Sequence, residues 1–218
     1  MAVYTVTKEK DGIVYGVTPN KTLFVTNAKN AKYSNNLMIP SEVQGIPVTG
    51  VANGAFISSK AKHVLFPASV TYVGENAFKA NVNIKSIIFQ AEEVEIAQSA
   101  FEGCFKLQQV AGKHFNLSGA RVFCHCKNMT EINGRMKGTI HPSTFAFCKR
   151  LEALSFNDNI VIHNEAFYGC MSIRAFMFET NASIAPTVMK FVEKRKIYCH
   201  EDSPLVEMIY NGTDVQVI

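Results

Sequence analysis

The stretch Ile96–Leu107, with the sequence IAQSAFEGCFKL, is one copy of a pattern that returns along this 218-residue chain. Its phenylalanine, Phe101, belongs to a series separated by 22, 23, 22, 22 and 22 residues. The members of the series are Phe56, Phe78, Phe101, Phe123, Phe145 and Phe167. A fixed period in the twenties is typical of a solenoid, in which each coil of the chain stacks on the previous one.

Other positions repeat together with the phenylalanine. Six residues after it the chain is apolar in five of the six coils, at Ile84, Leu107, Met129, Leu151 and Ile173. Three residues after it stand Cys104, Cys126, Cys148 and Cys170. Because free cysteine behaves as a small buried hydrophobe, we expect a column of buried, reduced thiols and a chain from a reducing compartment. Disulfides between neighbouring coils are the alternative.

Each coil reads as two short extended pieces joined by turns. One precedes the phenylalanine, as in Ile160–Ile162, and the other follows it by nine to eleven residues, as in Ile87–Phe89. Side chains alternate along a strand, so positions +9 and +11 are predicted to point inward and positions +8 and +10 outward. The coils should pair as parallel ladders, with an irregularity at Gly112–Ser118, which lacks a clean strand pattern.

The two ends of the chain depart from the repeat. Residues 1–36 are predicted to form an N-terminal β cap, residues 37–198 a solenoid of about seven coils, and residues 199–218 a C-terminal cap, all within one structural domain. Ser203, Pro204 and Gly212 frame a predicted two-turn helix in the last segment. A final strand is expected at 215–218.

The pattern Ile-x-x-x-Ala-Phe-x-x-Cys-x-x-Leu resembles the BspA-type (Treponema pallidum-like) leucine-rich repeat, and the match runs from about residue 36 to 200. The resemblance implies a β-dominant, right-handed leucine-rich-repeat solenoid of the α/β horseshoe class. It also implies a family of bacteria and parasitic protists whose members are often surface proteins linked to adhesion and protein binding. It transfers no catalytic residues.

Composition limits the possible partners. The net charge of +4 is well short of the charge typical of nucleic-acid binding, and a basic cluster at Lys190, Lys194, Arg195 and Lys196 is interpreted as a solvated face. No apolar run is long enough to span a membrane. The first twelve residues lack the apolar core of a secretory leader, which favours the cytoplasm. Secretion or a cell-surface location, after removal of a leader, is the alternative, and five Asn-x-Ser/Thr sites favour it weakly.

Two groups of residues are typical of metal sites but lack a full ligand set. His141 and His163 share one repeat position, and no third ligand follows them, so they are interpreted as turn histidines. In Cys124-His125-Cys126, the core column takes Cys126 and no paired C-x-x-C spacing exists. We predict no metal, no cofactor and no catalytic residues. The alternative enzyme hypothesis places a catalytic group on the irregular segment Phe115–Arg121.

The outward positions of the second strand predict a contact face. Large apolar residues stand at position +10 in three coils, and charged or polar residues surround them. The predicted face consists of Phe66, Ile88, Met177, Lys85, Arg174, Glu131, Asn133 and Ser155. Exposed apolar groups rimmed by charge favour a non-catalytic protein-binding scaffold whose partner is another protein or a second copy. A cell-surface adhesin is the alternative function, and coverage of the column by the chain's own loops is the alternative structure.

Overall fold

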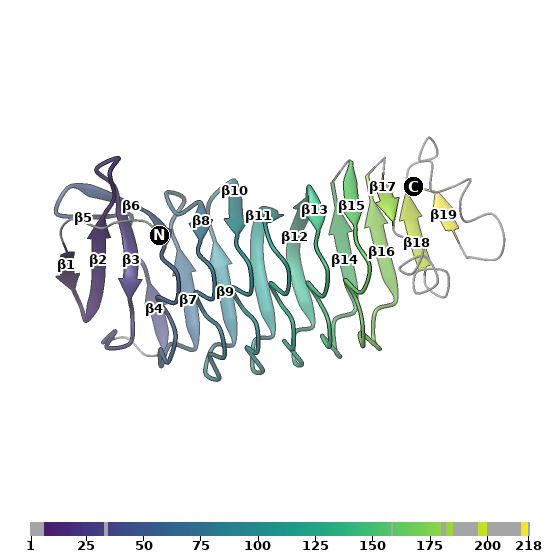
Figure 1. Cartoon of the computed structure of the whole chain (residues 1–218), viewed down its shortest axis with the longest axis horizontal. Coiled ribbons are helices and arrows are strands. Elements are labelled where there is room, and N and C mark those ends of the chain that lie inside the picture. Colours follow the sequence, from purple (N-terminus) through teal and green to yellow (C-terminus); the bar gives the residue numbers. More distant parts are fainter. Residues whose placement is uncertain are drawn as a thin grey trace.

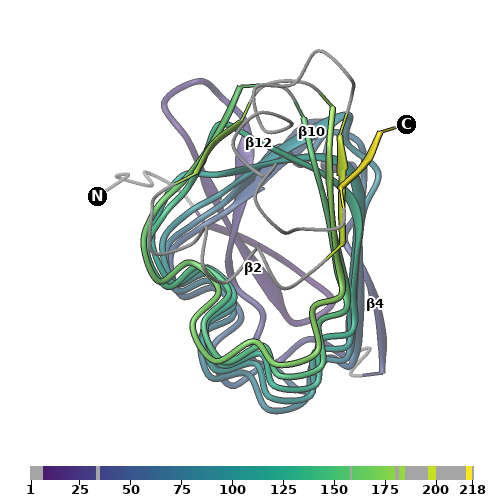
Figure 2. The same ribbon diagram turned by 90° about the vertical axis from the view of Figure 1, so that its right-hand side faces the viewer.

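The strands of this chain lie side by side along one long axis (Figure 1), and seen down that axis the coils superpose around a common interior (Figure 2). The structure, a computed structural model, describes residues 7–32, 35–157 and 159–179, and beyond them the backbone of three strands. The described part contains strands and no helix. The helix predicted between Ser203 and Gly212, and the basic cluster at Lys190–Arg195, lie outside the described residues.

One row of parallel strands follows the phenylalanine bends and forms the broad surface that we call the strand face. In pairing order its members are β4 (Asn36–Met38), β7 (His63–Phe66), β9 (Ser86–Phe89), β11 (Gln109–Leu117), β12 (Glu131–Lys137), β14 (Ala153–Phe156), β16 (Ala175–Phe178), β18 (Lys196–Cys199) and β19 (Val215–Val217). Every pair in this row is parallel, so the predicted β-solenoid of about seven coils is confirmed.

A second row precedes the phenylalanines. It begins with β6 (Ile46–Val51), β8 (Tyr72–Val73) and β10 (Glu93–Ile96), and β10 pairs with the last residues of β11. Farther along, β13 (Thr139–Ile140), β15 (Ile160–Ile162) and β17 (Ala182–Ile184) form a separate parallel sheet. The segment Gly112–Ser118 was predicted to be irregular. Most of it lies in β11, and the irregularity is limited to a register shift against β12 between Ala111 and His114.

The N-terminal strands have a different pairing. The strand β2 (Ile13–Val17) pairs antiparallel with both β1 (Thr7–Lys10) and β3 (Leu23–Asn27), and β3 joins β6 in parallel. The short β5 (Glu42–Val43) pairs antiparallel with β6. These strands lie at one end of the stack (Figure 1). The division of the chain into two caps and a solenoid stays a prediction.

The repeated phenylalanines form one continuous stack through the core. Their exposed fractions are 2% or less, and consecutive ring centroids from Phe56 to Phe167 are 4.3, 5.0, 5.2, 5.6 and 5.6 Å apart. Stacked aromatic pairs contribute about 0.5–1.5 kcal/mol each beyond the burial of their area. The 22-residue period is therefore the spacing that places one ring directly on the next.

The cysteine column is buried, as predicted, and its thiols are free. Each thiol donates to the carbonyl of the phenylalanine in the preceding coil. These bonds join Cys104 to Phe78, Cys126 to Phe101, Cys148 to Phe123 and Cys170 to Phe145, over 2.9–3.1 Å. In the second coil the amide of Asn81 donates in the same way to the carbonyl of Phe56. This repeat position therefore requires a small side chain that can donate a hydrogen bond to the preceding coil.

Thiol labelling of the native protein is expected to reach Cys104, Cys148 and Cys170 slowly or not at all. Burial raises the pKa of the Cys104 thiol to about 12 and that of Cys148 well above its ordinary value, so little reactive thiolate forms near neutral pH. The measurement is the rate of alkylation followed by mass spectrometry, with the denatured protein as the fully reactive control. Rapid labelling of all three native thiols would contradict the buried column.

Each phenylalanine bend is bracketed by two left-handed residues. The residue two before the phenylalanine and the residue two after it have positive φ in all six coils, and only Gly54, Gly103 and Gly169 among these twelve are glycines. An L-residue in this conformation costs roughly 1 kcal/mol, so packing and the bonds between coils must hold the bend in place. No repeated residue type marks these positions in the sequence.

The first coil corrects the predicted directions of the side chains along β7. Phe66 was predicted to point outward, but it is fully buried and stacks on Phe89 with ring centroids 5.0 Å apart. Its strand pairs Leu65 with Ile88 and Phe66 with Phe89, so Leu65 is the outward residue. Compared with the other 22-residue coils, this coil has one residue fewer between its phenylalanine and its strand. It has one residue more between that strand and the next phenylalanine. The two changes cancel in the 22-residue interval.

Candidate binding face

An apolar row crosses the N-terminal half of the strand face. Met38, Leu65, Ile88 and Ala111 are consecutive partners on β4, β7, β9 and β11. The exposed fraction is 70% for Met38 and 43% for Ile88, while Leu65 and Ala111 are half-buried. Adjacent strands lie about 4.8 Å apart, so the four side chains form one apolar surface about 15 Å long.

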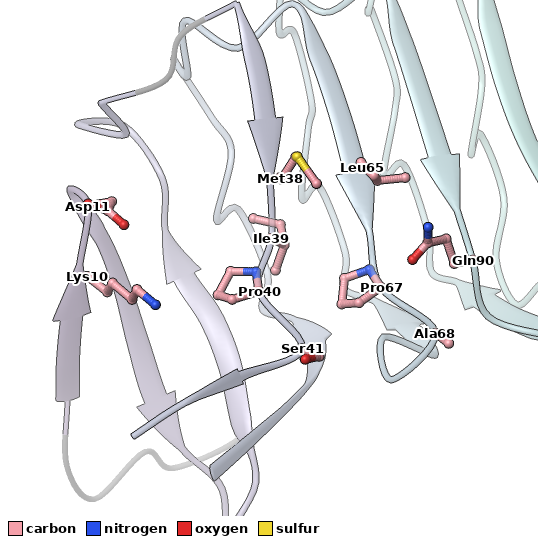
Figure 3. A pocket seen from close by; sticks show the side chains of 10 residues that line it. All are labelled: Lys10, Asp11, Met38, Ile39, Pro40, Ser41, Leu65, Pro67, Ala68 and Gln90. Atoms are coloured by element: carbon pink, nitrogen blue, oxygen red, sulfur yellow. The ribbon is translucent and has the colours of Figure 1, made fainter. Parts of the chain in front are cut away.

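A groove of about 590 Å³ adjoins this row where the β1–β2 turn approaches β4 and β7 (Figure 3). Met38 and Leu65 contribute apolar lining, and Pro40 and Pro67 follow the two strands. On the other side stand Lys10, the last residue of β1, and Asp11 in the β1–β2 turn. The groove therefore combines an apolar wall with one group of each charge.

A second, smaller depression lies farther along the same face. It has a volume of about 440 Å³, and its lining includes Glu131, Asn133, Ser155 and Met177. Glu131 accepts a bond from Gln109 Nε2 at 3.2 Å, and Met177 is 38% exposed. A Cβ at Gly134 would lie 2.6 Å from the carbonyl oxygen of Gly112 and 2.6 Å from Cε2 of Phe115. At Gly134, which lines the depression, the missing Cβ therefore leaves room for the ring of Phe115.

The structure brings some of the predicted residues together and separates others. Glu131, Asn133, Ser155 and Met177 line one depression. Ile88 belongs to the apolar row, with Lys85 exposed just before its strand, and Arg174 is exposed just before β16. Phe66 does not belong to the face, as described above. The binding role of the other seven residues stays a prediction.

Sequence reasoning missed Met38 and Leu65. A signal for both was present, because Ile39-Pro40 and Phe66-Pro67 are equivalent steps after a strand. Aligning the two prolines places Met38 beside Leu65 and turns Phe66 inward. The phenylalanine period alone could not give this alignment, since it does not say how residues divide between the bend and the strand.

Two ion pairs of the described residues meet at Glu102, beside a phenylalanine bend and away from the strand face. The Glu102 side chain is 13% exposed, and it binds Lys79 at 3.1 Å and also Arg121. Burial by itself would raise the pKa of the Glu102 carboxyl. The hydrogen bonds from Arg121, Ser99 and Lys79 outweigh this effect and lower the pKa to about 2.

Glu102→Gln is expected to lower the free energy of unfolding near neutral pH by about 1–2 kcal/mol. The folded pKa is depressed from 4.5 to about 2, so the carboxylate stabilises the fold above pH 4.5 and this contribution is lost as the pH falls toward 2. Denaturant titrations across this range should therefore show a flatter pH dependence for the variant. Glu75→Gln, at an exposed carboxylate without an ion pair among the described residues, is the matched control. Equal pH slopes for wild type and Glu102→Gln would refute the assignment.

The two candidate metal groups are placed by the structure as follows. The rings of His141 and His163 stack with centroids 6.1 Å apart, and burial together with the second histidine lowers the pKa of His141. Cys126 faces the carbonyl of Phe101, whereas His125 stacks on Phe147 at 4.6 Å. Within the described ranges, no group of three or more His, Cys, Asp or Glu residues gathers as metal ligands would.

The segment proposed for a catalytic alternative is largely part of the fold. Phe115 and Leu117 are buried in β11, and Arg121 is committed to Glu102. No helix within the described part of the chain is long and apolar enough to cross a membrane.

Comparisons with known proteins agree with this geometry. The pattern described as the BspA type leucine rich repeat region matches in six copies over residues 49–174, which is more than half of the chain. No curated protein matches the sequence.

Solved structures share the fold at low sequence identity. A leucine-rich repeat protein of T. pallidum is 19% identical with a TM-score of 0.63, covering 97% of this chain and 98% of that one. A leucine-rich cell surface protein of Faecalibacterium prausnitzii is 17% identical with a TM-score of 0.71, and the match covers 93% of this chain and 56% of that one. A leucine-rich repeat protein of Bacteroides ovatus is 17% identical with a TM-score of 0.51, and the match covers 88% of this chain and 70% of that one. At these identities the likeness shows the fold alone.

Proposed function

Since the chain belongs to the BspA-type leucine-rich repeat family, we propose that it is a non-catalytic scaffold that binds another protein through its strand face. The observation that carries the proposal is the row Met38–Leu65–Ile88–Ala111, in which apolar side chains are in register on four adjacent strands. An outward row of this kind is normally polar, and exposed apolar groups in line mark interaction surfaces.

The groove beside the row supports the same proposal. It offers an apolar wall at Met38 and Leu65, and the polar groups Lys10 and Asp11 stand at its opposite side. A partner that inserts an apolar side chain here would continue across Ile88 toward Ala111. The energy of such an interface is concentrated in a few central anchors. Met38 and Ile88 are the most exposed apolar side chains of the row.

The test places a photo-crosslinking amino acid at position 88 in the cells that make the protein, with position 161 as the control. Val161 is also an exposed apolar strand residue, 36% exposed, but it lies on β15 in the other sheet. We expect an adduct from position 88 that position 161 does not give. Identical adducts from both positions would refute the strand face as the site.

The captured partner, once purified, should bind Ile88→Asp at least about tenfold more weakly than wild type, and Val161→Asp equally well. Thermal unfolding of both variants should stay close to wild type, because both side chains point to solvent. If the captured partner is a second copy of the chain, sedimentation velocity should show a dimer that Ile88→Asp dissociates.

Adhesion at a cell surface is the second candidate function. The observation that favours it is the fold shared with the F. prausnitzii protein, which is described as a cell surface protein. The cytoplasmic location predicted from the sequence gains no support from the fold or the relatives. Protease added to intact cells should digest the protein if it is displayed outside, and should leave it intact if it resides in the cytoplasm.

A further inference from the structure

A second surface runs along the solenoid between the phenylalanine bends and the strand face. It carries eight exposed basic side chains, which we call the basic edge: Lys60, Lys62, Lys85, Lys106, Lys127, Lys149, Arg150 and Arg174. Glu152 is the one acidic residue in the same repeat positions. The whole chain has 22 basic and 18 acidic residues, so without this edge it would be net acidic. The basic edge therefore carries a local excess of positive charge.

Backbone bonds between coils fix the order of residues along this line. The amide of Lys85 donates to the carbonyl of Lys62 at 2.7 Å, and that of Gln108 donates to Lys85 at 2.8 Å. The series continues through Thr130 and Glu152 to Arg174. With about 4.8 Å between coils, the basic edge extends over about 25 Å.

The cations of the basic edge lack acidic partners within the part of the chain that the structure describes. Some cations elsewhere do have acidic partners, as in Lys79–Glu102, Arg121–Glu102 and Lys137–Glu93. Along the edge, lysines of neighbouring coils such as Lys62 and Lys85 stand side by side and repel one another. An anionic partner would relieve this repulsion.

Exposed apolar side chains alternate with the cations. Val82 is 48% exposed, Phe105 42% and Met171 70%, all four residues after a repeated phenylalanine. Nζ of Lys127 lies 5.2 Å from the centre of the Phe105 ring. Two of the three apolar residues are aliphatic, so they suit peptide side chains better than the stacked bases of a nucleic acid, which require flat aromatic platforms.

We infer that the basic edge binds an extended acidic segment of a partner protein, whose carboxylates meet the lysines and whose apolar residues contact Val82, Phe105 and Met171. This inference does not rest on the proposed function, which the row Met38–Leu65–Ile88–Ala111 carries. Two residues of the edge, Lys85 and Arg174, also belong to the face predicted from the sequence. An extended segment of about eight residues spans the 25 Å of the edge.

The experiment measures fluorescence anisotropy with a labelled peptide of about eight residues in which Glu and Leu alternate. The edge variant carries Lys106→Glu, Lys127→Glu and Lys149→Glu. The control variant carries Lys21→Glu, Lys29→Glu and Lys32→Glu, three exposed lysines near the N-terminus, and therefore has the same net charge. We expect the edge variant to bind at least about tenfold more weakly and the control variant to bind like wild type. Binding should also weaken as salt rises from about 0.05 to 0.3 M.

Two further probes test the chemistry of the partner. The same peptide with Gln in place of Glu should not bind, and a labelled oligothymidylate of equal charge should bind more weakly than the acidic peptide. Phe105→Ser should weaken the acidic peptide and leave the oligothymidylate unchanged. Equal losses in both triple variants, no binding of the acidic peptide at low salt, or tighter binding of the oligothymidylate would overturn the inference. Ile88→Asp should leave peptide binding unchanged, and a loss there would place the peptide on the strand face instead.

Discussion

Replacing Phe101 with alanine is expected to lower the free energy of unfolding by about 3–5 kcal/mol. The ring is fully buried and lies between Phe78 and Phe123, with centroids 5.0 and 5.2 Å away. Its removal opens a cavity in the middle of the stack, and the neighbouring rings cannot close it because the backbone bonds between coils hold them apart. Equilibrium denaturation of wild type and variant measures the difference.

Phe105→Ala is the control for this prediction. It removes the same side chain four residues later in the same coil, at a site that is 42% exposed. The expected cost is within about 1 kcal/mol, as for most surface substitutions. Comparable losses for Phe101→Ala and Phe105→Ala would show that the phenylalanine stack does not hold the coils together.

Phe66→Asp is expected to cost more than about 5 kcal/mol and to leave the chain unfolded at ordinary temperatures. The Phe66 ring stacks on Phe89 and meets the edges of Phe56 and Phe78 at 6.0 and 6.2 Å. An aspartate at this point would lose all these contacts and place an unpaired carboxylate among aromatic rings. Circular dichroism during heating measures the loss.

Leu65→Asp, at the preceding position, is the decisive comparison. Leu65 points to the strand face, so its replacement should be tolerated with a small change in stability. If Leu65→Asp unfolds the protein while Phe66→Asp does not, the directions of the two side chains are opposite to those described, and the apolar row of the strand face would have to be abandoned.

The solenoid could be predicted from the sequence because the repeated phenylalanine is both the clearest pattern in the sequence and the main packing contact between coils. One buried ring per coil produces both the 22-residue period and the continuous stack, so the period could be read without any knowledge of neighbours. The same holds for Ile88 and Met177, whose outward direction follows from alternation along β9 and β16. Both strands begin at the usual number of residues after their repeated phenylalanine.

Phe66 shows where this reasoning fails. Total coil length fixes the period, but the direction of a side chain depends on how many residues form the bend, and the first coil changes that number without changing the total. The groove beside Met38 could not be predicted either. It depends on how closely the β1–β2 turn approaches β4 and β7, which is a contact between elements and leaves no periodic trace.

The donor role of the cysteines was hidden for a related reason. Burial alone explains a small apolar residue, whereas Asn81 in the same column shows that a hydrogen-bond donor is required as well. Of the basic edge, the sequence singled out Lys85 and Arg174. The other six cations were missed because the eight are spread over four repeat positions.

The direction of the hydrogen bonds between coils has a mechanical consequence. Because the strands stack along the long axis (Figure 1), the bonds that join them run along that axis too. Tension applied between the two ends would therefore peel coils away one after another from an end, and would not load all the ladders at once in shear. Each coil of about 22 residues would release about 70 Å of extended chain as it opens. Under force, the molecule should lengthen in equal steps at low load and act as a tether that yields gradually.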